Sequence, residues 1–341
     1  MALITMSEAV SKYHVDKLAD QVAQAILREC LKQDRNSHVA VNVIISGTHC
    51  VLAGEIKSKA SFDRVQVAKQ FLHTLYPEID YEFEDYIRDQ SPEIDKAVID
   101  GGHTAAGDQG VVVGYYTDET PYGFPFAYSW ASLIIRTLEN EISDSNHLYL
   151  KGDAKALVVA DGYSIKHITV SACYKDGISL EDFRKYVKSV LLIHLNEIRK
   201  LPDDAWDINP SGEWHLEGSR ADTGLVGRKL AADLYGTEIP VGGGAITGKD
   251  PSKVDFSGNL FARYVAKDLA YRFGFSKLLV KASYSIGRER PIAVKAIADG
   301  QDVSDIASNY DWSVDGMTKE LGLNKSTSPW LAGLSLWEEE N

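Results

Sequence analysis

The order in which helical and extended patterns follow one another constrains the fold of this chain most. A helical pattern begins near Val15, and a second covers 61–75. Between them lie two β-branched runs, 38–46 and 50–56, which a short Gly-Thr segment separates, as in a hairpin. This first part of the chain therefore predicts helix, strand, strand and helix in succession.

The same order recurs twice more, at spacings of roughly a hundred residues, which is the size of a small domain. In the order helix, strand, strand, helix, the ranges are 126–141, 155–161, 164–174 and 180–198, then 257–273, 277–287, 291–298 and 303–321. Single strands do not alternate with helices, which argues against a doubly wound parallel sheet. We expect an α+β protein of three similar units, each packing helices on one face of a small mixed sheet. The expected domains are 1–92, 104–214 and 215–341.

Charge and composition limit the classes of partner. The chain has 341 residues and a net charge of -13, so its surface should repel nucleic acid and acidic membranes. No apolar run approaches the roughly 20 residues of a membrane span, and no basic segment with an apolar run begins the chain. Cys30, Cys50 and Cys173 form no C-x-x-C pair and are expected to be reduced core residues. We expect a cytoplasmic protein, in which any phosphate site is a local basic pocket.

One segment resembles a phosphate-binding P-loop. In "GGGAITGKD" (242–250), Gly243, Gly248 and Lys249 fit the spacing G-x-x-x-x-G-K. Asp250 follows where a P-loop needs Ser or Thr, and no convincing strand precedes the glycines. The match is weak, and a solvated glycine turn is the simpler interpretation. The glycines nevertheless expose backbone N–H groups beside Lys249 and Lys253, which could neutralise phosphate.

Other polar residues stand at the starts of helices or strands. His14, Asp16 and Lys17 precede or open the first helix, where anions are favoured, although a helix-start carboxylate and a surface histidine are the common case. Asp108 follows a glycine before a strand, where it could cap backbone N–H groups or bind a ligand.

Two further segments combine aspartate with cations. Asp153 and Lys155 stand at a strand entrance, where a surface ion pair is the simpler interpretation. Asp222, Arg228 and Lys229 share a glycine-containing segment, and Arg228 suits bidentate contact with phosphate oxygens. Many cations, several aspartates and no nucleophilic cysteine suit a polyphosphate leaving group neutralised by magnesium, Lys and Arg. They do not suit acyl transfer, which needs an activated nucleophile.

Taken in order, the motifs closely resemble methionine adenosyltransferase (S-adenosylmethionine synthetase). The matching segments are "SEAVSKYHVDKLADQ", "GEI", "QSPEI", "AAGDQGVVVGYYTDET", "GDAK", "INPSG", "DTGLVGRK" and "GGGAITGKDPSKVD". The resemblance implies three similar α+β domains about a pseudo-threefold axis. It also implies an active site between two subunits, hence a homodimer at least, with a tetramer left open.

The resemblance further implies the reaction and its residues. The sulfur of L-methionine attacks C5′ of ATP, and the expelled tripolyphosphate is hydrolysed to pyrophosphate and phosphate. It implies two magnesium ions per site, held by Asp16 and Asp255. The ATP residues are His14, Asp153, Lys155, Trp214, Asp222, Arg228, Lys229, Ala245 and Lys249; the methionine residues are Glu55, Gln90, Asp108, Asp222 and Lys253; the catalytic ones are His14, Lys155, Arg228 and Lys249.

The chain departs from the family pattern at several positions. Asn42 replaces a glutamate that helps to bind potassium, so potassium activation is left open. Tyr13 replaces a small glycine, and Glu213 and Trp214 replace an Arg-Phe pair, although Trp214 can still stack on a base. The loop after Gln90 and the C-terminal region are shorter than usual.

Two other functions remain alternatives to an active adenosyltransferase. A P-loop-like nucleotidase or kinase would hydrolyse ATP without methionine. A non-catalytic regulatory relative would share the fold, but such a protein is expected to lose His14, Asp16 or the lysine cluster, all of which this chain keeps.

Overall fold

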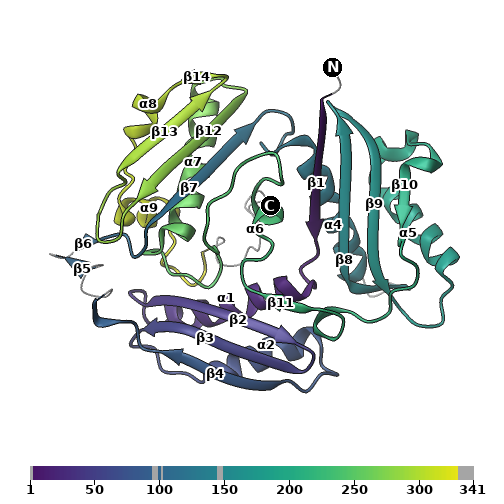
Figure 1. The fold of residues 1–341 in the computed structure, drawn as a ribbon, viewed down its shortest axis with the longest axis horizontal. Coiled ribbons are helices and arrows are strands. Elements are labelled where there is room, and N and C mark those ends of the chain that lie inside the picture. The colour runs from purple at the N-terminus through teal and green to yellow at the C-terminus, as the bar shows by residue number, and fades with distance from the viewer. Residues whose placement is uncertain (1–2, 94–98, 101–102, 144–148, 329–341) are drawn as a thin grey trace.

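Three four-stranded sheets and their helices surround the centre of the molecule (Figure 1). The computed structural model describes residues 3–93, 99–100, 103–143 and 149–328. The shortened C-terminal ending and much of the loop after Gln90 lie outside the described residues. The expected α+β class is confirmed, because helices and small sheets alternate in three passages along the chain. Two of the sheets are mixed, and the third is antiparallel throughout.

The first two passages share one order of elements: strand, helix, two strands, helix and strand. The third begins in the same way, but it has a short extra strand before its last helices and no described strand after them. The first consists of β1 (Ile4–Val10), α1 (Val15–Gln33), β2 (His38–Ser46), β3 (His49–Lys57), α2 (Arg64–Leu75) and β4 (Glu82–Arg88). A small hairpin of β5 (Ile99–Asp100) and β6 (His103–Thr104) follows. The second consists of β7 (Gly110–Thr117), α4 (Phe126–Ser143), β8 (Leu150–Asp161), β9 (Ser164–Tyr174), α5 (Leu180–His194), η1 (Asn196–Lys200), η2 (Asp203–Ala205) and β10 (Trp206–Ile208).

The third passage begins after the short helix η3 (Gly218–Arg220) and ends before the C-terminal segment. It consists of β11 (Thr223–Leu225), α6 (Leu230–Leu234), α7 (Val254–Phe273), β12 (Lys277–Tyr284), β13 (Ala293–Ala298), β14 (Gln301–Asp302), α8 (Ser304–Ser308) and α9 (Val314–Leu321). Its α7 and the β12–β13 hairpin correspond to α1 and the β2–β3 hairpin of the first passage.

Each passage gives its first strand to the sheet of another passage. β1 pairs with β8, β7 pairs with β12, and β11 pairs with β2, all antiparallel. The exchange is cyclic, because the first passage gives its strand to the second, the second to the third and the third to the first. Each incoming strand lies beside the equivalent strand of the receiving sheet. This arrangement agrees with three similar units about a pseudo-threefold axis. The domain ranges 1–92, 104–214 and 215–341 stay a prediction, because the sheets exchange strands across them.

The main elements form where apolar periodicity predicts them, and their ends follow local capping. α1 begins at Val15 as expected, but α2 begins at Arg64, three residues later than predicted, because the Asp63 side chain accepts the Gln66 N–H at 3.0 Å. The helical range 180–198 ends as α5 at His194 and continues as a 3₁₀ turn. The helical range 303–321 is divided into α8 and α9.

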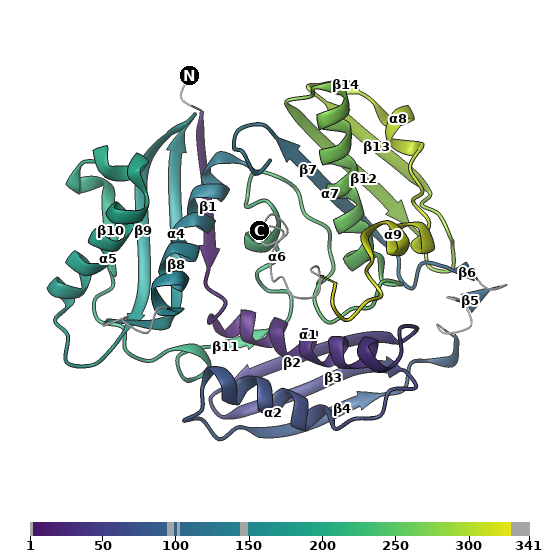
Figure 2. The same ribbon diagram turned by 180° about the vertical axis from the view of Figure 1, so that it is seen from behind.

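The helices cover only one side of the sheets. Figure 1 shows the sheets toward the viewer, and Figure 2, from behind, shows α1, α2, α4 and α7 in front of them. Apolar side chains on the uncovered side include Met6, Ile44, Val111 and Leu157, which are 48%, 41%, 50% and 38% exposed. The uncovered sheet face is therefore apolar in part and has no partner within the described chain.

The cysteine prediction is confirmed for the folded chain. Cys30, Cys50 and Cys173 are all free and buried, and burial raises the pKa of each thiol to about 12. They are therefore protonated at neutral pH. Among the described helices, none is both long enough and apolar enough to cross a bilayer.

Candidate active site

His14 lies between the end of β1 and the start of α1 and is 2% exposed. Its Nδ1 accepts the backbone N–H of Asp16 at 3.1 Å, so the neutral ring carries its proton on Nε2. Burial lowers the pKa of His14 to about 4, and the charges of Lys155 and Lys229 act in the same direction. At neutral pH, His14 is thus an uncharged ring whose Nε2–H can donate to a ligand oxygen.

Asp16, in the first turn of α1, fixes the end of β11 and the segment that follows it. One carboxylate oxygen accepts the Leu225 N–H at 2.9 Å, and the other accepts from Lys229 Nζ at 2.6 Å. Arg228 lies 3.5 Å from the same carboxylate with half of its side chain exposed. Burial opposes ionisation of Asp16, but the hydrogen bonds from Lys229 and Leu225 outweigh it and hold its pKa below the ordinary value.

Asp153 and Lys155 both lie on β8 and form no ion pair with each other in the described structure, although the charge of Lys155 acts on both Asp153 and His14. Asp153 is 3% exposed; its Oδ2 accepts the Gly218 N–H at 3.4 Å, and its Oδ1 has no hydrogen-bond partner among the described residues. Burial raises the pKa of Asp153 to about 7, with Glu217 adding to the effect. Lys155 is exposed.

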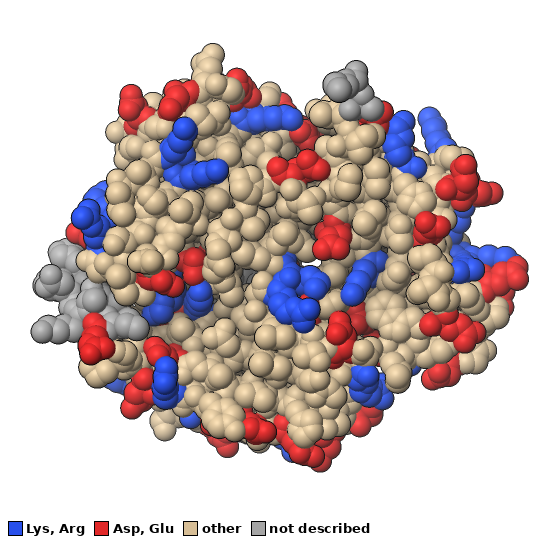
Figure 3. Space-filling view, in the orientation of Figure 1, with Lys and Arg blue, Asp and Glu red and all other residues tan. Residues whose placement is uncertain are grey.

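These residues form what we call the first cluster. Its members are His14, Asp16, Asp153, Lys155, Asp222, Arg228 and Lys229. Asp222 belongs to it because its charge acts on both His14 and Asp153. In Figure 3, Lys and Arg side chains gather near the middle of the face, close to where β1, β11 and α6 meet in Figure 1. A local basic pocket on an acidic protein is what the charge balance requires of a phosphate site.

A second set of charged residues surrounds the start of α7. Lys249 Nζ lies 2.7 Å from the Asp255 carboxylate. A Cβ on Gly244 would lie 1.9 Å from the same carboxylate, so only glycine lets the loop approach it this closely. The end of the loop runs along β2, where Val41 N–H donates to Gly248 O at 2.9 Å.

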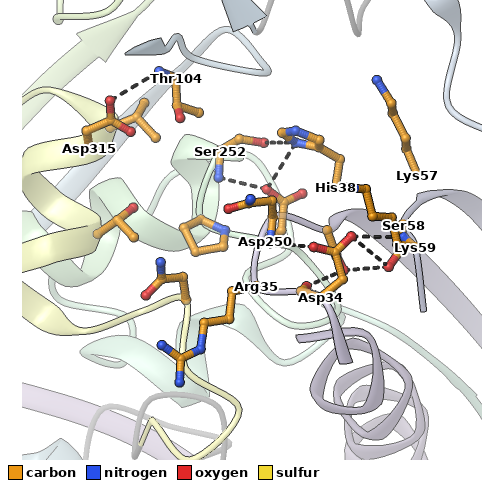
Figure 4. Close-up of a pocket in the computed structure, with 16 residues that line it drawn as sticks. Asp34, Arg35, His38, Lys57, Ser58, Lys59, Thr104, Asp250, Ser252 and Asp315 are labelled. Atoms are coloured by element: carbon orange, nitrogen blue, oxygen red, sulfur yellow. Dashed lines mark hydrogen bonds and ion pairs between the residues drawn. The ribbon is translucent and has the colours of Figure 1, made fainter. Parts of the chain in front are cut away.

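Lys253 precedes α7 and is held by a buried carboxylate. Its Nζ lies 3.4 Å from Asp250, which also accepts the Val39 N–H at 2.7 Å. Burial opposes ionisation of Asp250, but the charges of Lys253 and His38 outweigh it and keep its pKa far below the ordinary value. Figure 4 shows His38, Asp250 and Ser252 turned toward one another in the wall of a cavity of about 500 Å³.

Glu55 and Gln90 lie at the first sheet near this second set. Glu55 on β3 is opposite Ala40, and Ala40 forms an isolated bridge with Lys249. The Glu55 carboxylate lies 3.3 Å from Arg88. Gln90 is 8% exposed, and its Oε1 has no hydrogen-bond partner among the described residues.

Asp108 reaches the same region from the start of the second passage. The neighbouring Gly107 N–H donates to Ser252 O at 2.8 Å, and a Cβ on Gly110 would lie 3.4 Å from the Asp255 carboxylate. Asp108 itself accepts the N–H of the next residue at 2.7 Å, as expected for a turn. Glu55, Gln90, Asp108, Lys249, Lys253 and Asp255 form the second cluster.

The two clusters lie at different points along α1. The N–H groups of Leu225 and Gly248 donate to Asp16 and Gln24, respectively. These two helix residues are eight positions apart, or about 12 Å at the rise of an α-helix. One chain therefore brings most of the expected site residues into two groups rather than one.

The clusters are also related by the threefold pattern. Asp16 is the second residue of α1, and Asp255 is the second residue of α7, the equivalent helix of the third passage. Each carboxylate is paired with a lysine, Lys229 or Lys249. The fold thus builds the same Lys–carboxylate pair twice, at two equivalent helix N-termini.

Trp214 and Ala245 lie at the margins of the clusters. Trp214 is half-buried, and its indole N–H donates to Leu216 O. Glu213 lies 3.6 Å from His215. Ala245 packs its methyl group where Gly227 leaves room for it, since a Cβ on Gly227 would lie 2.6 Å away.

The structure argues against a P-loop at 242–250. No strand lies in the described 235–249 before Lys249, and α7 begins only at Val254. Among the described residues, no three His, Cys, Asp or Glu side chains gather as a metal-binding group. A metal at Asp16 or Asp255 would need ligands from elsewhere, and phosphate oxygens are suitable ones.

Glu217 and Asp20 are supporting residues that the sequence analysis missed. Glu217 accepts the N–H groups of Gly152 and Asp153 at 2.6 and 3.1 Å. Asp20 accepts the Gly227 N–H at 2.9 Å. The helical position of Asp20, one turn after Asp16, was the one available signal, and Glu217 had none.

The family comparisons cover nearly the whole chain. Models described as the N-terminal, central and C-terminal domains of S-adenosylmethionine synthetase match residues 2–97, 103–214 and 216–334. The chain is 35% identical to the S-adenosylmethionine synthase of Borrelia garinii subsp. bavariensis, covering 94% of this chain and 88% of the relative. It is 36% identical to that of Mycoplasma genitalium, covering 93% and 86%.

A solved structure shares the fold. The structure of an unusual S-adenosylmethionine synthetase from Campylobacter jejuni superposes with a TM-score of 0.85 at 27% identity. The superposition covers 98% of this chain and 92% of that one.

Proposed function

This chain belongs to the S-adenosylmethionine synthetase family, and on that premise we propose that it is a methionine adenosyltransferase that joins ATP and L-methionine. Relatives matched over nearly their whole length are named S-adenosylmethionine synthase.

The observation that carries the proposal is the duplicated Lys–carboxylate pair. Lys229 and Lys249 neutralise Asp16 and Asp255 at 2.6 and 2.7 Å. Magnesium triphosphate offers each partner a better-matched ligand, because phosphate oxygens attract the lysines and magnesium attracts the carboxylates. In the proposed complex both pairs would separate around a polyphosphate.

The donor set suits magnesium. Mg²⁺ is commonly bound by one or two carboxylates together with substrate phosphates and water, and Asp16 and Asp255 each offer one carboxylate. In the proposed complex each would hold one ion. When bound, magnesium neutralises part of the charge that grows on the leaving triphosphate.

The reaction needs alignment and charge stabilisation rather than a base. The methionine sulfur forms a bond to C5′ of ATP while the bond from C5′ to the triphosphate oxygen breaks, which leaves a sulfonium and tripolyphosphate. His14 is neutral, and its Nε2–H would donate to the leaving oxygen. Lys155, Arg228 and Lys249 would neutralise the phosphates, and a water would then cleave tripolyphosphate to pyrophosphate and phosphate.

Substrate recognition is assigned to both clusters. ATP would contact Asp153, Asp222 and Lys229 in addition to the catalytic cations, with Trp214 on the base and Ala245 at the backbone. Methionine would lie against the second cluster, where Glu55 and Asp108 carry charge that suits its ammonium group and Lys253 suits its carboxylate.

We further infer that two subunits complete each site. In one chain the segments that carry the two clusters contact α1 at Asp16 and Gln24, about 12 Å apart along the helix. Lys155 and Glu55 both lie on strands of sheets that the helices leave partly uncovered (Figure 1). Stacking two uncovered faces would bury Ile44 and Leu157 and bring the first cluster of one copy to the second cluster of the other.

Product analysis tests the proposal directly. The purified chain is incubated with ATP, magnesium and L-methionine, with and without potassium, and S-adenosylmethionine and pyrophosphate are quantified by mass spectrometry. We expect both products only when methionine is present. ATP hydrolysis without methionine, or a folded chain that makes no S-adenosylmethionine, would overturn it. Asn42 is exposed on β2, and equal rates with and without potassium would connect it to lost activation.

A further inference from the structure

The backbone just before Asp153 is not held by the sheet to which it belongs. The pairing of β8 with β9 shifts register between Leu150 and Ala154, and the pairing of β8 with β1 ends at Lys155. The peptide groups of Gly152 and Asp153 therefore need other partners, since a buried N–H without one is costly. This irregular stretch carries the carboxylate that faces the first cluster.

Glu217 supplies those partners from a distant loop. One of its oxygens accepts the N–H of Gly152 at 2.6 Å and that of Asp153 at 3.1 Å. Glu217 is 9% exposed, and both hydrogen bonds have a charged acceptor, which makes them strong. The carbonyl of Gly152 accepts from Ser11 Oγ at 3.0 Å, so both polar groups of this residue are fixed.

Tyr13 closes the remaining side of the same residue. A Cβ on Gly152 would lie 2.5 Å from Cγ of Tyr13, so the ring packs directly on the Gly152 backbone. The Tyr13 carbonyl accepts from the Tyr76 hydroxyl at 3.2 Å, which fixes the backbone immediately before His14. Tyr13, Gly152 and Glu217 also line one cavity, of about 300 Å³.

As far as folding is concerned, it is unfavourable to bury the Glu217 carboxylate beside that of Asp153. Both side chains are buried, and like charges at close range repel strongly away from water. Asp153 Oδ1 is also left without a partner among the described residues. The repulsion between the carboxylates and the unpaired Asp153 Oδ1 both cost stability. A functional role explains why both are tolerated, if Oδ1 is the atom that binds a ligand.

We propose that Glu217 and Tyr13 are positioning residues for the nucleotide: they clamp Gly152 from two sides and thereby aim the Asp153 carboxylate at bound ATP. Neither residue needs to touch the substrate. The proposal rests on the proposed function, because it takes the first cluster to be the ATP side of the site. Loss of the clamp should then weaken ATP binding and leave methionine binding unchanged.

The test compares variants of the full chain by steady-state kinetics and by calorimetric binding of the magnesium complex of a non-hydrolysable ATP analogue. Glu217→Ala should raise the KM for ATP and the Kd of the analogue about tenfold, which corresponds to the loss of one charge-assisted hydrogen bond. The KM for methionine should change less than about twofold, and Glu217→Gln, whose amide oxygen can still accept, should restore most of the affinity. Glu181→Ala, which removes an exposed glutamate on α5, is the matched control.

The outcomes are distinguishable. An unchanged Kd in Glu217→Ala, an equal rise in both KM values, or a Gln variant as weak as the Ala variant would each overturn the clamp. If Glu217→Ala does not fold by circular dichroism, Tyr13→Ala carries the test, with the same separation of ATP from methionine expected. A wild-type chain that binds the analogue but makes no product would contradict the proposed function, and the binding data would still decide the clamp.

Discussion

The effect of Asp153 on stability depends on pH. Burial raises its pKa from 3.8 to about 7, so the folded state favours the protonated carboxyl. The stability that this proton contributes is fully present below the unfolded pKa and is lost as pH rises through about 7. We expect Asp153→Asn to raise the free energy of unfolding at pH 8 by about 1 to 4 kcal/mol relative to the wild type, and by progressively less toward pH 4. Urea unfolding of both proteins across this range measures the difference.

The same variant should lose activity at every pH, since the proposed ligand to ATP is altered. Asp207→Asn is a suitable control, because Asp207 has an exposed carboxylate on β10. A stability gain that is the same at pH 5 and pH 8 would show that the charge of Asp153 is not its cause.

Two of the three exchanged strands, β7 and β11, contain a glycine pressed against a helix backbone. A Cβ on Gly114 of β7 would lie 2.0 Å from the backbone of Ala262 in α7, and one on Gly224 of β11 would lie 2.2 Å from the Val15 carbonyl in α1. Neither helix can yield by rotating a side chain. We expect Gly114→Ala to separate β7 from α7 and to cost about 3 kcal/mol.

Thermal unfolding checks this prediction against Gly243→Ala. Nothing lies within 4 Å of a Cβ at Gly243, and its φ is not in the left-handed range. The control should therefore change the free energy of unfolding by less than about 0.5 kcal/mol. A similar loss in both variants would mean that the close strand–helix contact is not the cause.

At the scale of the whole molecule, a site shared by two subunits predicts complementation. Lys229→Ala disables the first cluster and Lys249→Ala disables the second. Each variant alone should be inactive, because each removes a phosphate cation from every site. A mixed dimer would keep one intact site, so co-refolding equal amounts should restore about a quarter of wild-type turnover.

The association of two subunits is measured by sedimentation of the wild type and of Ile44→Asp. This variant places a charge on the uncovered sheet face. We expect this variant to be folded, monomeric and inactive. Activity in a proven monomer, or no recovery on mixing, would contradict the shared site.

The sequence by itself determined the elements that have a period. Apolar spacing located α1, the β2–β3 hairpin, α4 and α7 to within a few residues. It did not reveal the exchange of β1, β7 and β11, because strand pairing across distant parts of the chain leaves no local signal. β10 and β11 have three residues each, too few for any periodicity.

The site divides in the same way. The motifs named Asp16 and Lys229 as chemically useful residues, but not that they pair, since 213 positions separate them. Glu217 was missed because its role depends on a register shift in β8 that only the folded sheet creates. Residue types and helix starts are local properties that a sequence carries. The tertiary structure alone decided which carboxylate meets which lysine and which sheet face stays uncovered. Both depend on how the three sheets close around one another.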